Sequence, residues 1–322
     1  MRAVDQRTIR RLESLDTEQR NPASKGISAW PTMEMLRCIN TQDQTVALRV
    51  ADALPDIAKA VDLVVGRMER GGRLVYVGTG TSGRLGYMDA AECPPTYGCD
   101  EDTVACVMAG GHDAVFRAQE MLEDHGEIAQ ADLEAWGLRP ADTVVAASAS
   151  GRTPYCVSAL DYAASIGAGT VALVCNTDSE MGRHAEVAIE IHTGAEVIMG
   201  STRMKAGTAQ KMVMNMISTA AMVRMGRTFD NLMVMIKAHN VKANHRMLRL
   251  FAQIVDNPDL DYAREMMEAA DGDLSVAVLM ALYGVTPERA RDAIDEHGGH
   301  FGDVMQALEI QAERPSDLNA EC

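Results

Sequence analysis

Two short segments combine glycine with hydroxyl side chains directly after an apolar run, and this combination suits the binding of an anion. The first follows Leu74–Val77 and contains Thr81, Ser82 and Gly83. A strand that enters a glycine turn and then a helix leaves backbone N–H groups free to bind an anion. Hydroxyl groups add the several donors that the oxygens of a terminal phosphate monoester need. This segment therefore predicts a binding site for the phosphate of a phosphosugar.

The second segment repeats this chemistry after the apolar residues 143–147. It contains Ser150 and Thr153, separated by Gly151 and Arg152. One interpretation is that the two hydroxyls only cap the helix that follows. The pairing with the first segment favours phosphate binding, because ligands of parallel sheets bind at the carboxyl ends of the strands.

A dinucleotide site is the competing hypothesis for the first segment. Gly78, Gly80 and Gly83 have the G-x-G-x-x-G spacing of that fold. The next predicted strand, 103–108, is followed by Ala-Gly-Gly and not by the carboxylate that would bind a ribose. An NAD-dependent oxidoreductase needs that carboxylate, so the sequence favours a phosphosugar.

From residue 73 onward, predicted strands and helices alternate. This rhythm predicts an α/β fold with a mostly parallel sheet flanked by helices. The expected strands are 73–77, 103–108, 143–147, 170–174 and 187–191. The expected helices are 84–92, 112–124, 127–136, 154–165 and 203–226, preceded by 1–20, 31–40 and a long pattern over 44–70 that Pro55 bends or divides.

The character of the chain changes near residue 257. Beyond this point short helical patterns are separated by glycines. We therefore expect a catalytic, phosphosugar-binding domain over 1–256, which includes the N-terminal helices, and a small helical domain over 257–322.

Composition excludes several classes of protein. The 322 residues carry a net charge of −16, which disfavours binding to nucleic acid or to an anionic membrane. The first residues have no apolar signal-peptide core, and no run of about 18 apolar residues occurs. The seven cysteines form no C-x-x-C pair, which fits a reducing compartment and no structural metal. We expect a cytoplasmic protein.

Four longer segments resemble the N-acetylmuramic acid 6-phosphate etherases, a family with the sugar isomerase (SIS) fold. They are GTGTSGRLGYMDAAECPPTYG from Gly78, MAGG from Met108, SASGRTPY from Ser148 and GSTRMKAGTAQK from Gly200. The resemblance covers most of residues 17–255. The chain departs from the usual family pattern at residues 28–32, at Thr79 and at Met235, which affects expected substrate contacts.

The resemblance implies a reaction and its residues. Family members remove D-lactate from the 3-ether of N-acetylmuramic acid 6-phosphate, without a metal or redox cofactor, and the family suggests a homodimer with sites near the interface. In this chain Glu92 matches the acid that protonates the departing lactate, and Glu123 matches the base at C2. Thr81, Ser82, Gly83, Ser150 and Thr153 are expected to bind the phosphosugar, with Lys205 and Arg203 as candidates for holding an anion.

The residues themselves leave alternatives open. Glu92 also fits a solvated carboxylate at a helix end. Glu123 lies nearly opposite the apolar face of the helix predicted over 112–124, so Glu120 and Asp124 compete with it. A noncatalytic phosphosugar sensor, like the glucokinase regulatory proteins that share the fold, needs the hydroxyl segments but neither glutamate as acid or base. The carboxylate pair therefore distinguishes the enzyme from the sensor.

Overall fold

A computed structural model describes residues 15–237 and 241–313. Its centre is a five-stranded parallel sheet with the order β2-β1-β3-β4-β5. The strands are β1 Leu74–Gly78, β2 Val104–Met108, β3 Thr143–Ser148, β4 Gly169–Val174 and β5 Val187–Glu190. The five apolar runs thus form the predicted strands, and the α/β prediction is confirmed.

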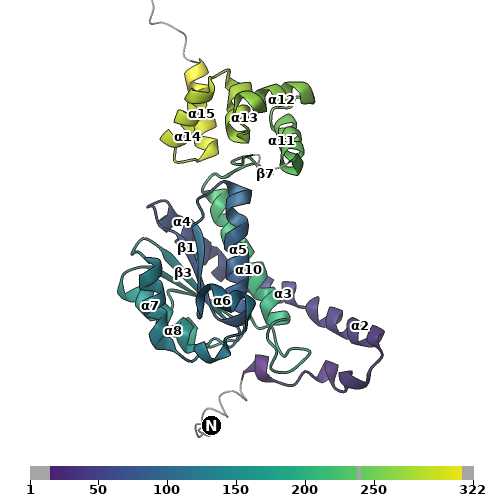
Figure 1. Cartoon of the computed structure of the whole chain (residues 1–322). Helices are drawn as coiled ribbons and strands as arrows, with labels where there is room; N and C mark the ends of the chain where they lie inside the picture. Colours follow the sequence, from purple (N-terminus) through teal and green to yellow (C-terminus); the bar gives the residue numbers. More distant parts are fainter. Residues whose placement is uncertain (1–14, 238–240, 314–322) are drawn as a thin grey trace, which may run out of the picture. The chain divides into compact units, whose positions relative to one another are not determined.

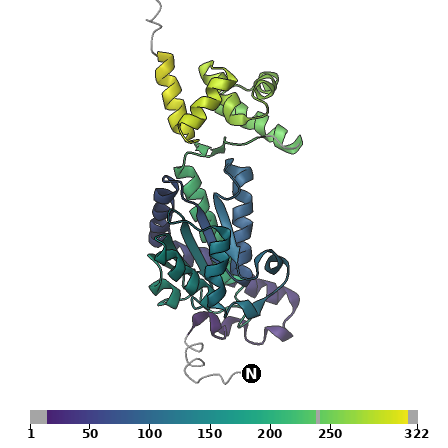
Figure 2. The ribbon, with the colours of Figure 1, turned by 60° about the vertical axis from the view of Figure 1, so that its left-hand side comes forward.

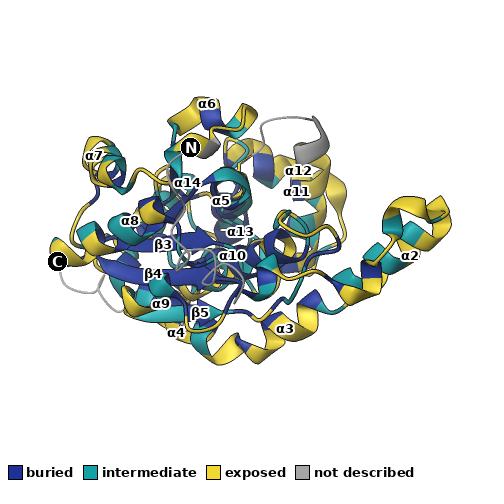
Figure 3. Ribbon diagram, turned by 90° about the horizontal axis from the view of Figure 1, so that it is seen from below, coloured by how far each residue is buried: buried dark blue, intermediate teal, exposed yellow. Residues whose placement is uncertain are grey.

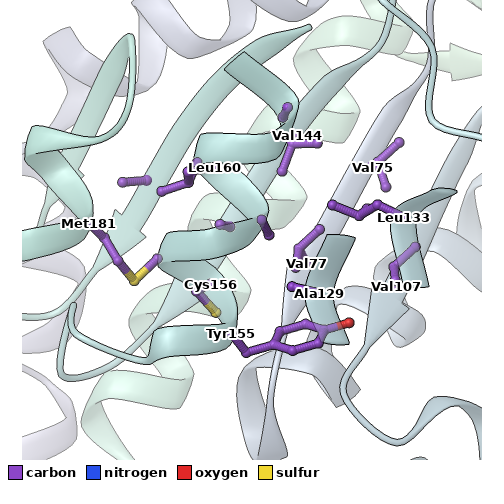
Figure 4. Packing of buried hydrophobic residues seen from close by; sticks show 14 of the residues in the cluster. Val75, Val77, Val107, Ala129, Leu133, Val144, Tyr155, Cys156, Leu160 and Met181 are labelled. Carbon is purple, nitrogen blue, oxygen red and sulfur yellow. The ribbon is translucent and has the colours of Figure 1, made fainter. Parts of the chain in front are cut away.

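Helices cover both faces of this sheet (Figures 1 and 2). On one face, α7 Gly126–Trp136 and α8 Pro154–Ser165 pack against alternate strand residues. Figure 4 shows this cluster, which includes Val75, Val77, Val107, Leu133, Val144, Tyr155 and Leu160. On the other face, Tyr76 contacts α5 Gly80–Tyr97 and α10 Lys205–Arg224. Burial on both faces explains why the central strands β1, β3 and β4 are apolar along most of their length.

The N-terminal part consists of short helices. They are η1 Asp16–Glu18, η2 Pro22–Ser24, η3 Ile27–Ala29, α2 Thr32–Asp43, α3 Val46–Asp52 and α4 Leu54–Met68. The pattern over 44–70 is divided near Pro55, as predicted, and Pro55 occupies the first turn of α4, where its missing N–H is not needed. Residues 1–14 of the helix predicted over 1–20 lie outside the described residues.

Two predicted helices have different bounds in the structure. α5 begins at Gly80 instead of near Arg84, and it continues through Pro94 and Pro95 to Tyr97 instead of ending at Glu92. The helix predicted over 112–124 is wrong, because the structure has α6 Gly111–Phe116 and a separate 3₁₀ turn, η4 Glu120–Leu122. Arg84 donates to the carbonyls of Ala114 and Val115 at 2.8 and 2.7 Å. These bonds satisfy carbonyls that end the helix.

Contacts divide the chain into two compact units, residues 1–91 with 101–221 and residues 92–100 with 222–322. The second unit contains the hairpin β6 Thr228–Phe229 and β7 Leu232–Met233. Its helices are α11 Val241–Ile254, α12 Leu260–Ala269, α13 Leu274–Tyr283, α14 Pro287–Glu296 and α15 Phe301–Glu313. Phe251 of α11 shares a core with Leu274 and Phe301, so α11 packs with the C-terminal helices. The domain boundary at 256/257 remains a prediction about independent folding.

Two general features bear on the function. Within residues 15–237 and 241–313, no helix has the length and apolar character required to span a bilayer. In the same part of the chain, His, Cys, Asp and Glu side chains form no group of three or more that would bind a metal ion.

A buried carboxylate ties α5 to the sheet and to α10. Asp89 is 4% exposed, and it accepts the Tyr76 hydroxyl at 2.7 Å and the Ser218 hydroxyl at 3.2 Å. The side-chain amide of Asn215 donates to the same carboxylate. Donors from β1 and α10 thus converge on one residue of α5, and they fix how this helix packs on the sheet.

We expect Asp89→Ala to lower the free energy of unfolding by about 2–5 kcal/mol, because it leaves buried donors without their acceptor. Urea unfolding monitored by circular dichroism measures this change. Asp52→Ala is the matched control, since the Asp52 side chain is 73% exposed. Its effect should stay within about 0.5 kcal/mol. Equal stability of the two variants would contradict this role of Asp89.

Candidate active site

The two hydroxyl segments lie at the carboxyl ends of neighbouring strands. β1 pairs with β3, and Gly78 is in register with Ala147. From β1 the chain continues to β2 on one side, while β3 lies on the other side, so the strand order reverses between β1 and β3. Ligands of open parallel sheets bind at such a point. The sheet therefore brings the two segments together where a binding site is expected.

The first segment forms the start of α5. Gly80 has φ +49°, which glycine adopts without strain, and the following Thr81 and Ser82 lie in the first turn of the helix. The N–H groups of a first helical turn have no intrahelical acceptor. Ser82 is 8% exposed, and its Oγ donates to Gln210 Oε1 at 2.8 Å. Backbone donors and hydroxyls thus meet at the end of β1.

The second segment is held by hydrogen bonds among its own hydroxyls. Ser148 Oγ lies 2.7 Å from Thr153 Oγ1 and 3.2 Å from Ser150 Oγ. Gly151 has φ +71°, and a Cβ on it would lie 2.7 Å from Ser179 Cβ, so this position needs glycine. Thr153 makes no side-chain cap to α8. The hydroxyls therefore do more than cap the helix: they form a cluster beside the first segment.

Glu123 lies next to the first segment. A Cβ built on Gly80 would lie 3.5 Å from Glu123 Oε1, and the Glu123 carbonyl accepts the backbone N–H of Tyr155 at 3.2 Å. Burial raises the pKa of the Cys156 thiol, and the charge of Glu123 raises it further. The carboxylate is therefore close to both hydroxyl segments. Asp124 is exposed.

Glu92 lies inside α5, and the helix continues beyond it. The residue is exposed in the single chain, whereas the next residue, Cys93, is 2% exposed. The Glu92 carbonyl accepts the Thr96 hydroxyl at 2.6 Å. This is a bond from a threonine hydroxyl to the carbonyl four residues earlier in the helix. Pro94 and Pro95 lack the N–H groups that would bond to the carbonyls of Ala90 and Ala91. Because Glu92 is exposed, solvent reaches it in the single chain.

Lys205 begins α10 and is 5% exposed. Its Nζ donates to the Ala195 carbonyl at 3.2 Å and reaches Gln42 Oε1 at 3.5 Å. Burial lowers the pKa of its ammonium group, while Glu196 opposes that shift. Arg203, the other predicted cation, is exposed. These contacts hold the Lys205 ammonium in the loop that precedes α10.

Two polar residues that contact this part of the structure, Glu196 before α10 and Gln210 within it, were not predicted from the sequence. Glu196 accepts the backbone N–H groups of Lys205 and Ala206 at 3.0 and 3.1 Å, so a buried carboxylate caps the helix. Gln210 accepts the Ser82 hydroxyl. Neither role could be predicted from a local sequence pattern, because Glu196 precedes the helix by nine residues and Gln210 is separated from Ser82 by 128 residues.

Two domain-family models match the part of the chain that forms the sheet. The SIS domain model matches residues 123–220, and that of the glucokinase regulatory protein N-terminal SIS domain matches residues 56–164. A solved phosphoheptose isomerase from Francisella tularensis is 15% identical, with a TM-score of 0.48 over 60% of this chain and 98% of its own.

Curated relatives match nearly the whole chain. An N-acetylmuramic acid 6-phosphate etherase from Streptomyces coelicolor is 48% identical over 92% of this chain and 95% of its own. A protein of the same name from Clostridioides difficile is 43% identical over 94% of this chain and 99% of its own. With the parallel sheet and the two hydroxyl segments in place, this similarity confirms the resemblance seen in the sequence. The chain belongs to the N-acetylmuramic acid 6-phosphate etherase family.

Proposed function

We propose that the protein cleaves the D-lactyl ether of N-acetylmuramic acid 6-phosphate and releases N-acetylglucosamine 6-phosphate and D-lactate. The observation that carries this proposal is the carboxylate of Glu123 beside Gly80, at the two hydroxyl segments. A noncatalytic sensor would need the hydroxyls but no carboxylate at that position. The etherase relatives described above favour the enzyme as well.

The phosphate supplies the binding energy that positions the sugar. Backbone N–H groups at the start of α5 and the hydroxyls of Thr81, Ser82, Ser150 and Thr153 are the proposed donors, with Gly83 allowing close approach of the backbone. Hydrogen bonds to a charged group contribute about 1.5–3 kcal/mol each. Lys205 adds a positive charge near the start of α10. A substrate without phosphate loses all of these interactions.

The proposed chemistry is an elimination followed by an addition. In the ring-opened sugar, the C2 hydrogen is acidic because it lies next to the C1 aldehyde. Glu123 removes this proton, the bond from C3 to the lactate oxygen breaks, and Glu92 protonates the departing oxygen. Water then adds to the unsaturated aldehyde: the water oxygen bonds to C3, Glu92 accepts a proton from it, and Glu123 returns the proton to C2. One base and one acid suffice, provided that one carboxyl is ionised and the other protonated.

The proposed assembly is a homodimer, in which a second copy covers apolar surface of the first unit. α2 has no buried residue, and Met33 and Leu36 on it are 58% and 53% exposed. Figure 3 shows α2 coloured as exposed or intermediate along its length. Ile198 and Met199, in the loop before α10, are also more than half exposed. Apolar patches of this kind mark protein interfaces.

We expect the protein to have twice the mass of one chain in light scattering at micromolar concentration. Leu36→Arg should shift it toward monomer, because a charge at a buried interface position costs several kcal/mol. Arg37→Glu, a change on the same helix that only replaces one charge by another, is the control. A wild-type protein that stays monomeric would remove this part of the proposal.

The proposed location is the cytoplasm. Among the described residues, six cysteines carry thiols outside any disulfide, namely Cys38, Cys93, Cys99, Cys106, Cys156 and Cys175. Burial raises the pKa of Cys106 and Cys156, so these thiols are protonated and unreactive. Free thiols fit a reducing compartment.

The experiment that tests the function is incubation with N-acetylmuramic acid 6-phosphate and enzymatic assay of released D-lactate. We expect release without added nicotinamide cofactor. N-acetylmuramic acid without the phosphate should be a poor substrate, because it lacks the group that the hydroxyl segments bind. Binding of the phosphosugar without lactate release would identify a sensor instead. Equal efficiency with both sugars would contradict the phosphate site.

A further inference from the structure

Gln210 on α10 is buried against Ser82, and one end of its amide has no hydrogen-bond partner. The residue is 1% exposed, and its Oε1 accepts the Ser82 hydroxyl at 2.8 Å. Its Nε2 has no partner among the described residues. Buried N–H groups without a partner are rare in proteins, and unpaired carbonyl oxygens are less so. In this orientation the Gln210 amide therefore has a buried N–H group without an acceptor, next to the predicted phosphate site.

The hydroxyl of Ser82 has a single hydrogen. While Gln210 Oε1 accepts this hydrogen, Ser82 cannot donate to a phosphate. An ionised phosphate offers only acceptors, so Ser82 must redirect its hydrogen before it can contribute to binding. The hydrogen bond seen between these two side chains thus competes with the proposed ligand.

Rotation of the Gln210 amide by half a turn gives the amide N–H an acceptor and also ends the competition for the Ser82 hydrogen. The amide nitrogen then takes the place of the oxygen beside Ser82 Oγ and donates to it. The serine hydrogen becomes available to the phosphate, and the unpartnered atom is now the carbonyl oxygen. The two ends of a glutamine amide have nearly the same shape, so the rotation changes hydrogen bonds and not packing. Packing also fixes the helix here, since a Cβ on Gly207, one turn earlier, would lie 3.4 Å from Thr81 Cγ2.

We propose that Gln210 is a positioning residue for phosphate recognition: when a phosphosugar binds, its amide donates to Ser82 Oγ and directs the serine hydrogen to the phosphate. This inference rests on the proposed function only in taking the ligand to be a phosphosugar. In the bound state Gln210 acts on the phosphate through Ser82 and does not contact it.

Three variants test the inference by calorimetric binding of N-acetylglucosamine 6-phosphate at about pH 8, well above the ordinary pKa of glutamate. Gln210→Glu keeps an acceptor for the serine hydrogen and removes the donor, so binding should weaken roughly tenfold to a hundredfold, as in Ser82→Ala. Gln210→Met offers the serine hydrogen only a weak sulfur acceptor, which a charged phosphate outcompetes, so binding should stay within about fivefold of wild type. Adding Ser82→Ala to Gln210→Glu should weaken binding by no more than about threefold.

Gln253→Glu makes the same chemical change at an exposed position of α11, and it should bind like wild type. Wild-type binding by Gln210→Glu, or a loss of tenfold or more in Gln210→Met, would show that the amide is only a fixed acceptor and would overturn the inference. The Gln210→Met result decides alone if Gln210→Glu does not fold. Because binding is measured without turnover, a protein that releases no D-lactate but follows this pattern would contradict the proposed function and retain the inference.

Discussion

Glu123→Gln is expected to abolish both D-lactate release and hydrogen exchange at C2 of the sugar. Glutamine has nearly the same shape as glutamate but cannot accept a proton at neutral pH. Removal of a general base costs about 10²–10⁴-fold in rate. Both observables depend on the same proton abstraction, so both should fall together. The measurement is incubation with substrate or with N-acetylglucosamine 6-phosphate in deuterated water, with the C2 proton followed by NMR.

The neighbouring carboxylates provide the controls for this experiment. Asp124 is exposed, and Asp124→Asn should retain exchange and release. Binding of N-acetylglucosamine 6-phosphate to Glu123→Gln should also persist, since the hydroxyl segments are unchanged. A variant with full activity would exclude Glu123 from the mechanism. Loss of exchange in Glu120→Gln, with Glu123→Gln active, would transfer the role of base to Glu120.

The hydroxyl segments were predictable because all of their determinants are local. An apolar run that ends in glycine and hydroxyl residues specifies a strand, a turn and a helix start within about ten residues. The βαβ alternation then places such turns at one edge of a parallel sheet. Thr81 and Ser150 lie at the ends of β1 and β3 for these reasons alone. That β1 and β3 are neighbours follows from the strand order, which the structure supplies.

The position of Glu123 could not be predicted in this way. Its apparent place on the polar face of a helix assumed that residues 112–124 form one continuous helix. Arg84, about thirty residues earlier in the chain, donates to carbonyls at the end of α6, which stops at Phe116 before η4 begins at Glu120. Helical periodicity has no information about such a contact. The pairing of Ser82 with Gln210, across 128 residues, was inaccessible for the same reason.

Glu92→Gln should separate the two half-reactions. D-Lactate release requires a proton on the departing oxygen, so it should fall by about 10²–10⁴-fold when the acid is lost. Proton abstraction at C2 does not require that acid, and exchange should persist in the same sample. Glu101→Gln, an exposed carboxylate between α5 and β2, is the control and should retain both activities.

The results for the two variants together assign the roles of acid and base. Glu123 is the base and Glu92 the acid if Glu92→Gln shows C2 exchange without lactate release and Glu123→Gln shows neither exchange nor release. The reverse pattern exchanges their roles. Since Glu92 is exposed in the single chain, its action as an acid also requires cover that excludes water and keeps the carboxyl protonated. If a second copy provides that cover, Leu36→Arg should reduce lactate release more than C2 exchange, which is the pattern expected for Glu92→Gln. Equal loss of both in Leu36→Arg would show that dimerisation acts on the site in some other way than through the acid.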